Sequence, residues 1–462
     1  MKIYNTLNNQ KEVFQPKEKK QIKMYVCGPT VYNYFHIGNA RPFLFFDVVR
    51  RYFEYKKYIV TYAQNITDVD DKIIKKANDE NVDYKQITQK YIKAFKEDCK
   101  RLGIKKPDYQ PKATDYIEKM INFISDLIEK KHAYENNGDV YFAVESIDDY
   151  GSLSGRKLSD MKIGARIKKN ENKKNPADFT LWKKAKKDEP SWDSPWGKGR
   201  PGWHTECVVM SLDLLGSGFD IHAGGNDLIF PHHENEIAQA KAQTGKNMAK
   251  FWMHNGFINV EGEKMSKSLN NFFLTRDVLK NYSAETIRFF FLSKHYRSPI
   301  DFNEKLIKEA ETAITGLYNS ISSIPDLELS SIPNTFEENE EEISFSNAMD
   351  DDFNTAHALS VIFNLNKQVK NEKLKMKTRR QKARLLIKLG KVLGFFDNIQ
   401  LKLGQNNDLQ DDLIELLINY RTNFKQEKNW EMADKIRADL RGLGVELRDA
   451  PEKTTWKINK KY

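Results

Sequence analysis

The sequence contains thiol, imidazole and carboxylate side chains of the kinds that hold a zinc ion. Cys27 follows a strand-like run at residues 22–26, and Cys207 lies far along the chain. His232 and Glu236 are four residues apart, a spacing that places both on one face of a helix. Zinc accepts cysteine, histidine and carboxylate ligands, and a site with thiolates in a cleft can accept a sulfur atom from a bound ligand. The four residues therefore predict a zinc centre that selects a thiol.

The choice of metal ligands within residues 232–236 is open at this stage, because His233 and Glu234 stand beside His232. The four-residue spacing favours His232 with Glu236, since the equivalent partner of His233 is Ile237, which cannot bind a metal. A closed zinc site that only holds the fold together is the alternative to one that binds a ligand.

A second motif, His36-Ile37-Gly38-Asn39, is expected where a strand-to-helix turn opens a helix. Backbone N–H groups and the positive end of the helix dipole favour phosphate at such a place. His36 and Asn39 can both donate to a triphosphate, and Gly38 leaves room for the close approach of a base or ribose. Taken alone the tetrapeptide is a weak signal, because a surface histidine at a helix start is common.

A third motif, Lys-Met-Ser-Lys-Ser at residues 264–268, is expected to form a loop after a strand at 256–260. Lys264 and Lys267 can then reach negative charge that develops on transferred phosphates. A solvated turn explains this run equally well when it stands alone. The two motifs in this order and at this separation are far more specific.

The elements around these motifs predict an α/β fold with a Rossmann-type domain. Strands are expected at residues 22–26, 59–63 and 218–222. A helix from about 36 to 55 joins the first two strands, and a helix that begins at Pro231 and ends at Gly245 carries His232 and Glu236.

Changes of pattern along the chain predict six segments. They are the first half of the Rossmann-type domain at 1–104, an inserted domain at 105–200, the second half at 201–255, a signature-loop region at 256–305, a helical domain at 306–403 and a small mixed α/β unit at 404–462. The insertion is expected to hold two helical stretches, a Gly/Ser segment and a lysine-rich loop. The acidic run near 337–342 is expected in a loop, because such runs are usually solvated. Two helices, near 412–426 and 430–441, and a hairpin that turns at 449–451 are expected in the last segment.

Composition limits the class of protein. The chain has 462 residues, of which 39% are hydrophobic, so several cores are expected. It has no apolar run of membrane-spanning length and no secretory signal pattern at residue 1. Three cysteines do not make a disulfide framework, which favours a reducing cytoplasm, and Cys99 is expected to be an unreactive helix residue. The net charge of +10 is compatible with a polyanionic partner.

The second and third motifs together resemble the two signatures of the class I aminoacyl-tRNA synthetases, and the wider context resembles the cysteinyl-tRNA synthetase family. The resembling segments are 24–41, 65–72, 178–182, 201–207, 222–236, 264–273, 288–298 and 350–355. The general first signature ends in histidine where this chain has Asn39. Asparagine keeps an N–H donor but cannot become cationic, so more of the phosphate stabilisation falls on His36, the helix terminus and the two lysines.

The resemblance implies activation of L-cysteine with ATP, followed by transfer of cysteine to tRNA(Cys). The implied catalytic residues are His36, Asn39, Lys264 and Lys267. The implied ATP-binding residues are His36, Gly38, Asn39, Gly225, Asp227 and Lys267. The implied substrate contacts are Gly28, Thr67, Trp203 and His222, although Trp203 is equally suited to a core. The implied zinc ligands are Cys27, Cys207, His232 and Glu236.

The resemblance further implies one zinc ion per chain and Mg²⁺ with ATP. It implies tRNA binding by the helical domain, contact of the 256–305 region with the acceptor stem, and anticodon binding by the C-terminal unit. A monomer in the cytoplasm is expected. Two other functions stay open: a ligase that joins cysteinyl-adenylate to a small amine, and a non-catalytic RNA-binding or zinc-binding protein. The helical and C-terminal segments argue against the first, and the intact signatures argue against the second.

Overall fold

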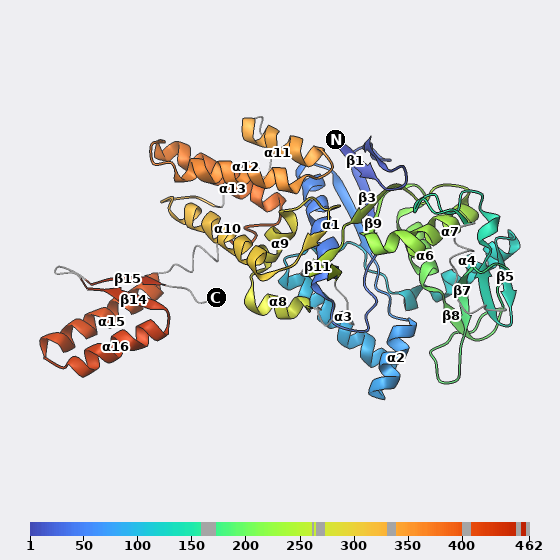
Figure 1. Ribbon diagram of the computed structural model, residues 1–462, viewed down its shortest axis with the longest axis horizontal. Helices are drawn as coiled ribbons and strands as arrows, with labels where there is room; N and C mark the ends of the chain where they lie inside the picture. Colours follow the sequence, from blue (N-terminus) through green and yellow to red (C-terminus); the bar gives the residue numbers. More distant parts are fainter. Residues whose placement is uncertain are drawn as a thin grey trace. The chain divides into compact units, whose positions relative to one another are not determined.

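A computed structural model describes residues 1–158, 172–260, 263–264, 273–329, 339–399, 408–449 and 454–458. The chain divides into two compact units, Met1–Phe395 and Phe396–Tyr462 (Figure 1). Among the described helices, none combines the length and apolar character that crossing a bilayer requires. The finer division into six segments stays a prediction.

A four-stranded parallel sheet with the order β10-β9-β3-β4 forms the centre of the first unit (Figure 1). Its strands are β3 (Gln21–Val26), β4 (Ile59–Gln64), β9 (Phe219–Gly225) and β10 (Ala249–Asn255). Helix α1 (Ile37–Tyr55) connects β3 to β4 and buries most of its side chains. Parallel sheets are covered on both faces, which explains why most residues of β3 and β9 are buried. The predicted Rossmann-type α/β fold is confirmed.

The connections leave β3 in opposite directions, because its sheet neighbours are β4 on one side and β9 on the other. In open parallel sheets such a switch point creates a crevice beyond the carboxyl ends of the strands. Cys27 follows β3 directly, and Gly224 and Gly225 end β9. The fold therefore places the first candidate ligand at the position where ligands bind in this class of sheet.

The insertion differs from the prediction of two helical stretches and loops. One described helix, α4 (Ile117–Glu129), follows a short turn, η1 (Ala113–Tyr116), and another short turn is η2 (Val144–Ser146). Most of the segment is an antiparallel sheet with the order β5-β6-β7-β8. Its strands are β5 (Ala133–Asn136), β6 (Asp139–Phe142), β7 (Phe179–Lys184) and β8 (Gly199–Pro201). These strands are too short to show clear alternation, and β7 lies inside the stretch expected as a lysine-rich loop.

The remaining elements of the first half and the site region are mostly helical. They are β1 (Lys2–Asn5), β2 (Gln10–Val13), α2 (Asp71–Glu80), α3 (Tyr84–Arg101), α6 (Trp203–Leu215), η3 (Asn226–Leu228), η4 (Ile229–His233) and α7 (Glu234–Thr244). Gly245 ends α7 with φ +65°, as predicted. Pro231 does not open the α-helix; it lies in the π-helical turn η4, so His232 precedes α7 and Glu236 lies in its first turn.

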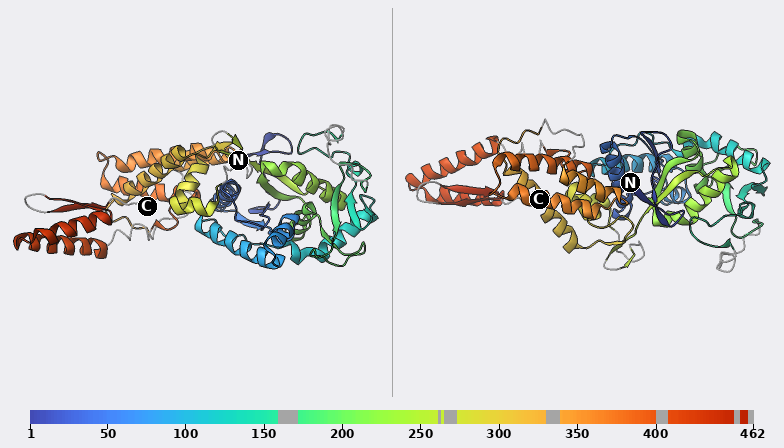
Figure 2. Two further views of the ribbon diagram at one scale, coloured as in Figure 1. Left: turned by 60° about the horizontal axis from the view of Figure 1, so that its bottom comes forward. Right: turned by 90° about the horizontal axis from the view of Figure 1, so that it is seen from above.

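The signature region and the helices after it make up the rest of the first unit. Its elements are β11 (Ile258–Val260), β12 (Glu263–Lys264), β13 (Ile300–Asp301), α8 (Thr275–Asn281), α9 (Ala284–Leu292), α10 (Glu304–Ser322), α11 (Glu340–Asp350), α12 (Thr355–Lys370) and α13 (Met376–Val392). The views in Figure 2 show the insertion (teal and green) and the helices α10 to α13 (yellow to orange) on opposite sides of the parallel sheet.

The acidic run is helical where the structure describes it, so the predicted loop is wrong for Glu340, Glu341 and Glu342. These residues form the first turn of α11, and Asn339 caps the helix by accepting a hydrogen bond of 2.9 Å from the Glu342 N–H. Carboxylates in a first turn lie at the positive end of the helix dipole, which stabilises the charges that the sequence pattern assigned to solvent.

The second unit has the two helices and the hairpin that were predicted. Its elements are α15 (Asp408–Gln426), α16 (Trp430–Gly442), β14 (Val445–Arg448) and β15 (Thr455–Ile458). Its small core consists of Ile414, Ile418, Leu440, Val445 and Leu447. The hairpin turn was predicted at residues 449–451, of which 450 and 451 lie outside the described residues.

Candidate active site and metal centre

The four predicted zinc ligands come from four different elements and converge beyond the carboxyl end of β3. Cys27 follows β3, Cys207 lies in α6, His232 lies in η4 and Glu236 lies in α7, and all four are buried. Cys27 Sγ lies 3.8 Å from Cys207 Sγ, 3.8 Å from His232 Nε2 and 3.7 Å from Glu236 Oε1. Ligand atoms of a tetrahedral zinc ion are themselves about 3.3–3.8 Å apart. This donor set therefore fits one zinc ion.

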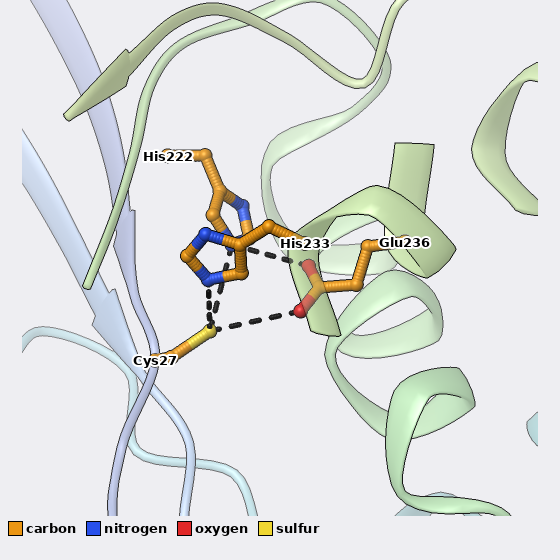
Figure 3. Close-up of side chains that lie close together, drawn as sticks. All are labelled: Cys27, His222, His233 and Glu236. Atoms are coloured by element: carbon orange, nitrogen blue, oxygen red, sulfur yellow. Dashed lines mark hydrogen bonds and ion pairs between the residues drawn. The ribbon is translucent and has the colours of Figure 1, made fainter. Parts of the chain in front are cut away.

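A second set of buried donors shares Cys27 and Glu236 with the first (Figure 3). His233 Nε2 lies 3.2 Å from Cys27 Sγ. His222 Nε2 lies 3.5 Å from the same sulfur and 3.1 Å from Glu236 Oε2. The two sets differ in chemistry, because the first supplies two thiols and the second supplies one.

Glu234, the other carboxylate that the sequence left open, faces away from the cluster. Its Oε2 accepts a hydrogen bond of 2.8 Å from the backbone N–H of Ser154 in the insertion. It belongs to neither group of potential metal ligands among the described residues.

The electrostatics of the cluster favour the ionised forms of one thiol and one carboxylate. A hydrogen bond donated by Cys27 lowers the pKa of Cys207 to about 6, while burial raises the pKa of Cys27. Burial opposes ionisation of Glu236, but the neighbouring His222 and His232 hold its pKa well below the usual range. The fold thus supports a thiolate and a carboxylate at one buried point, and a cation stabilises such a pair.

Two further residues orient His232 from outside the cluster. The His204 Nδ1 lies 2.9 Å from the His232 Nδ1, so the Nε2 of His232 is directed to Cys27 and Glu236. Trp203 stacks on the His232 ring with centroids 4.2 Å apart. Partners of this kind fix the ring orientation of metal-binding histidines.

A cavity of about 390 Å³ reaches from Cys27 to the start of α1. It is lined by eight of the predicted site residues: Cys27, Gly28, His36, Gly38, Asn39, Trp203, Gly225 and Asp227. This volume is within the range of small-molecule sites. Trp203 is 39% exposed, so the alternative of a core tryptophan is wrong.

Comparison with known proteins agrees with this arrangement. Residues 13–312 match the family of tRNA synthetases class I (C) catalytic domain, and residues 344–397 match the DALR domain. The chain is 49% identical to the cysteine–tRNA ligase of Carboxydothermus hydrogenoformans, over 99% of this chain and 100% of that protein. The chain belongs to the cysteine–tRNA ligase family.

Solved structures of other class I synthetases share the fold at low identity. The methionyl-tRNA synthetase of Mycobacterium tuberculosis in complex with methionyl-adenylate is 14% identical, with a TM-score of 0.57 over 81% of this chain and 89% of that one. The agnB2 LeuRS of Agrobacterium radiobacter K84, in a ternary complex with tRNA and LeuAMS, is 12% identical, with a TM-score of 0.59 over 85% and 86% of the two chains.

The first signature of this cysteine–tRNA ligase family member lies at the N-terminus of α1. His36 is the N-cap residue, and Gly38 and Asn39 lie in the first turn. A Cβ atom on Gly38 would lie 2.7 Å from His36 Nδ1, so the glycine makes room for the imidazole ring. The positive end of the helix dipole favours phosphate at this end of the cavity.

The second signature is only partly described. Lys264 pairs with Asn259 in the β11–β12 hairpin, and nothing is stated of its side chain. Lys267 lies outside the described residues. The segment after the signature is held at α1, because the Ile37 N–H donates to the Phe273 carbonyl at 2.9 Å and the Thr275 N–H to the Phe35 carbonyl at 3.1 Å. The described chain that follows the second signature therefore lies beside the first signature.

Two predicted substrate contacts do not line the cavity. Thr67 is buried, and its hydroxyl donates to Glu206 Oε2 at 2.8 Å. His222 is fully buried and stacks on Trp252 with centroids 4.4 Å apart. Burial raises the pKa of Glu206 well above its usual value. Thr67, Glu206 and His222 are therefore buried side chains that do not line the cavity.

Sequence reasoning missed three residues that the structure places around the cluster or the cavity. Tyr25 is fully buried and stacks on His222, with centroids 5.3 Å apart. The His254 Nε2 lies 2.8 Å from the His233 Nδ1. Asn255 lines the cavity as the last residue of β10. The rule that ligands bind beyond the carboxyl ends of parallel strands could have pointed to Asn255.

Proposed function

We propose that this protein activates L-cysteine with ATP and transfers it to tRNA(Cys), with a zinc ion on Cys27, Cys207, His232 and Glu236 that selects the substrate thiol. The observation that carries the proposal is one cavity that extends from a buried thiol-containing cluster to the phosphate-binding end of α1. A thiol at one end and a triphosphate at the other leave the amino-acid carboxylate between them, beside the α-phosphorus.

The donor chemistry supports the set with two thiols over the set with His222 and His233. Zinc that must accept a further sulfur is better matched by soft thiolate ligands. Each set has an oriented histidine, because His204 and Trp203 contact the His232 ring and His254 lies 2.8 Å from His233. When bound, the zinc ion supplies a Lewis acid to which a thiolate coordinates and a hydroxyl does so poorly.

Formation of the adenylate is an in-line attack of the cysteine carboxylate on the α-phosphorus, with pyrophosphate leaving. This step needs positioning and stabilisation of charge more than a protein nucleophile. We assign phosphate binding to His36, Asn39 and the positive end of the α1 dipole. Lys264 and Lys267 neutralise the charge that develops on the leaving pyrophosphate. Mg²⁺ accompanies ATP as its counter-ion.

The nucleoside end of ATP is assigned to the carboxyl end of β9. Asp227 lines the cavity there, and its carboxylate can accept a hydrogen bond from a ribose hydroxyl. Gly225 has no side chain, and a Cβ at that position would lie 2.4 Å from Asp227 Oδ1. The glycine therefore permits the close approach of Asp227 to the end of the strand.

Transfer to tRNA is assigned to the predicted parts that follow the Rossmann-type halves and their insertion. The 256–305 region would contact the acceptor stem, the helical domain at 306–403 would bind the tRNA body, and the 404–462 unit would bind the anticodon. The last unit combines the cations Arg437, Arg441, Arg448 and Lys457 with Trp456, a combination suited to unstacked bases. We place the enzyme in the cytoplasm, since its function needs reduced thiols at the metal site. We expect it to act as a monomer.

Amino-acid-dependent ATP–pyrophosphate exchange by the full-length protein tests the proposal, with cysteine and serine compared in parallel. Exchange is expected with cysteine, and aminoacylation is expected with tRNA(Cys). Absence of cysteine-dependent exchange in folded, zinc-containing protein would contradict the activity. Exchange with transfer to a small amine, and none to tRNA, would identify the amine ligase instead.

A further inference from the structure

Asn255 is a buried carboxamide at the edge of the cavity. It is 2% exposed. Neither its Nδ2 nor its Oδ1 has a hydrogen-bond partner in the part of the chain that the structure describes. Buried polar groups are almost always paired, and an unpaired donor together with an unpaired acceptor is costly. Because Asn255 also lines the cavity, a bound ligand can supply the missing partners.

The surroundings of Asn255 indicate which part of the ligand reaches it. In the parallel sheet Asn255 pairs with Gly225, so it stands beside the strand end that carries Asp227. The next three residues, Gly256, Phe257 and Ile258, also line the cavity. Phe257 is 37% exposed and presents an apolar surface to solvent. A donor–acceptor pair next to an apolar wall suits a planar heteroaromatic base.

Three other polar positions of the cavity suit other parts of the ligand. The phosphates belong at the N-terminus of α1, where the helix dipole attracts anions. The amino-acid thiol belongs at the cluster that begins at Cys27. The carboxylate of Asp227 accepts but does not donate, which suits a ribose hydroxyl and not the combined donor and acceptor of a base edge.

We propose, as an extension of the function proposed above, that Asn255 binds the adenine base of ATP through its carboxamide. Oδ1 accepts from the exocyclic 6-amino group, and Nδ2 donates to a neighbouring ring nitrogen. Asparagine pairs with adenine in this bidentate manner elsewhere in nucleic-acid recognition. Asn255 thus positions the nucleotide and contributes to the choice of ATP.

Nucleotide affinity and exchange kinetics of Asn255→Ala test the assignment. The KM for ATP in pyrophosphate exchange should rise about tenfold or more, as expected for loss of a bidentate base contact, while the KM for cysteine and the zinc content stay unchanged. Asn366→Ala is a matched control, because Asn366 is 8% exposed with an unpaired Oδ1 but lies in α12 and does not line the cavity. Its KM for ATP should equal that of the wild type.

A comparison of two nucleotides separates base contact from a general structural effect. Purine riboside triphosphate lacks the 6-amino group, so it should be a poorer substrate than ATP for the wild type. In Asn255→Ala that difference should largely disappear, because the partner of the amino group is gone. Equal sensitivity of both proteins to loss of the amino group would overturn the base contact. A coupling found instead with 2′-deoxy-ATP would move Asn255 to the ribose and overturn the assignment as well.

Two measurements keep this test independent of folding and of the proposed activity. If Asn255→Ala does not fold, Asn255→Asp retains the shape but replaces the donor by an acceptor, and it should weaken ATP more than inosine triphosphate, which carries a ring N–H. Direct titration of ATP into each protein needs no cysteine activation. An unchanged dissociation constant for ATP in a folded variant would overturn the role of Asn255, whereas loss of cysteine-dependent exchange in the wild type would contradict only the proposed function.

Discussion

At the scale of single residues, the metal cluster contains more potential ligands than one zinc ion needs. Cys27 and Glu236 belong to both possible sets, whereas Cys207 with His232 and His222 with His233 distinguish them. Substitution can decide between the sets, because removal of a ligand lowers metal affinity more than removal of a neighbouring side chain does.

We predict that Cys207→Ser and His232→Ala each lose most of the zinc, measured by elemental analysis of the purified protein. His233→Ala should keep about one zinc ion per chain under the favoured ligand set. Cys99→Ser is the control, since Cys99 lies in α3 outside both sets and burial raises its pKa. Full retention in Cys207→Ser together with loss in His233→Ala would assign the other set.

We also predict that the enzyme rejects serine at activation, with a kcat/KM for cysteine on the order of 10⁴-fold or more above that for serine. An apolar pocket separates such near-isosteres by only about a hundredfold, whereas a site built for a particular polar partner discriminates far more strongly. A thiol ionises readily on a metal, and an alcohol does not. Pyrophosphate exchange with both amino acids gives the ratio. Weak discrimination, or rapid hydrolysis of seryl-tRNA(Cys), would contradict selection by zinc.

At the scale of elements, α1 positions both signatures. Arg41 lies one turn beyond His36 and is 1% exposed. Its guanidinium donates to the carbonyls of Gly256, Phe257 and Ser298, at 2.7, 3.0 and 2.7 Å. A Cβ on Gly256 would lie 2.6 Å from the Ser298 carbonyl oxygen, so these segments are packed backbone to backbone. Arg41 therefore fixes the strand that leads into the second signature relative to the first.

Arg41→Lys should lower kcat for pyrophosphate exchange by roughly 10- to 100-fold, with little change in the KM for cysteine. One ammonium group cannot reproduce the fork of donors, and small misplacements of catalytic groups cost rates of this size. Arg50→Lys is the control on the same helix. Arg50 binds Glu54 and the Lys106 carbonyl, which belong to neither signature region. Equal kcat values in the two variants would contradict the positioning role.

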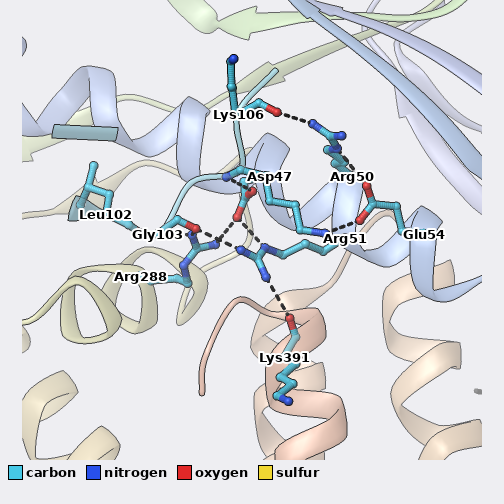
Figure 4. Close-up of polar contacts among 10 residues, drawn as sticks. Asp47, Arg50, Arg51, Glu54, Leu102, Gly103, Lys106, Arg288 and Lys391 are labelled. Atoms are coloured by element: carbon cyan, nitrogen blue, oxygen red, sulfur yellow. Dashed lines mark hydrogen bonds and ion pairs between the residues drawn. The ribbon is translucent and has the colours of Figure 1, made fainter. Parts of the chain in front are cut away.

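The middle of α1 carries a buried ion cluster (Figure 4). Asp47 Oδ2 lies 2.8 Å from Arg51 Nε and 2.8 Å from a terminal nitrogen of Arg288 in α9. Arg51 and Arg288 also donate to the Gly103 carbonyl, at 3.0 and 3.1 Å. Burial opposes ionisation of Asp47, but Arg288 and Arg51 lower its pKa below the ordinary value. The cluster joins α1 to α9 and to the loop after α3.

Asp47→Asn should destabilise the first unit by about 3–5 kcal/mol, because it leaves two buried guanidinium groups without their carboxylate. Glu304→Gln is the control, since the Glu304–Lys308 pair is exposed and its loss should leave stability nearly unchanged. Since the folded pKa of Asp47 is depressed, its contribution is present above the unfolded pKa and is lost as the pH falls through the folded value. Urea unfolding at neutral and acidic pH measures the loss of stability and its pH dependence. Equal midpoints for Asp47→Asn and Glu304→Gln at neutral pH would contradict the predicted loss.

At the scale of the whole molecule, the contacts separate Phe396–Tyr462 from the rest of the chain. That unit has a core of its own, and Arg421 donates to both oxygens of Asp449 at 2.7 and 2.8 Å. The cavity and both potential ligand sets lie entirely in Met1–Phe395. The proposed anticodon-binding unit can therefore be removed without removing any residue of the cavity.

Removal of the residues after 406 should leave pyrophosphate exchange within about twofold of the full chain and reduce charging of tRNA(Cys) by at least about tenfold, as loss of a few base-stacking contacts would. Zinc content and the thermal unfolding of the truncated protein serve as controls for an intact first unit. Normal charging by a folded truncated protein would show that the C-terminal unit does not read tRNA.

The sequence by itself determined the features that depend on short stretches of chain. The β3-α1-β4 unit, the end of α7 at Gly245 and the C-terminal hairpin follow from local periodicity and turn residues. The two signatures are short contiguous patterns, so the resemblance to the family also follows from the amino-acid sequence alone. His232 and Glu236 could be paired because their spacing of four residues is a helical repeat.

Only the tertiary structure decided what depends on packing between distant segments. It excluded Glu234, brought His222 beside Cys27 and converted Glu340 to Glu342 into a capped helical turn. The antiparallel sheet of the insertion joins strands on both sides of a long connection, from β6 to β7. The sequence also could not show that the buried carboxamide of Asn255 lacks a hydrogen-bond partner among the described residues. Whether a buried polar group is hydrogen-bonded depends on all the neighbours that the fold places around it.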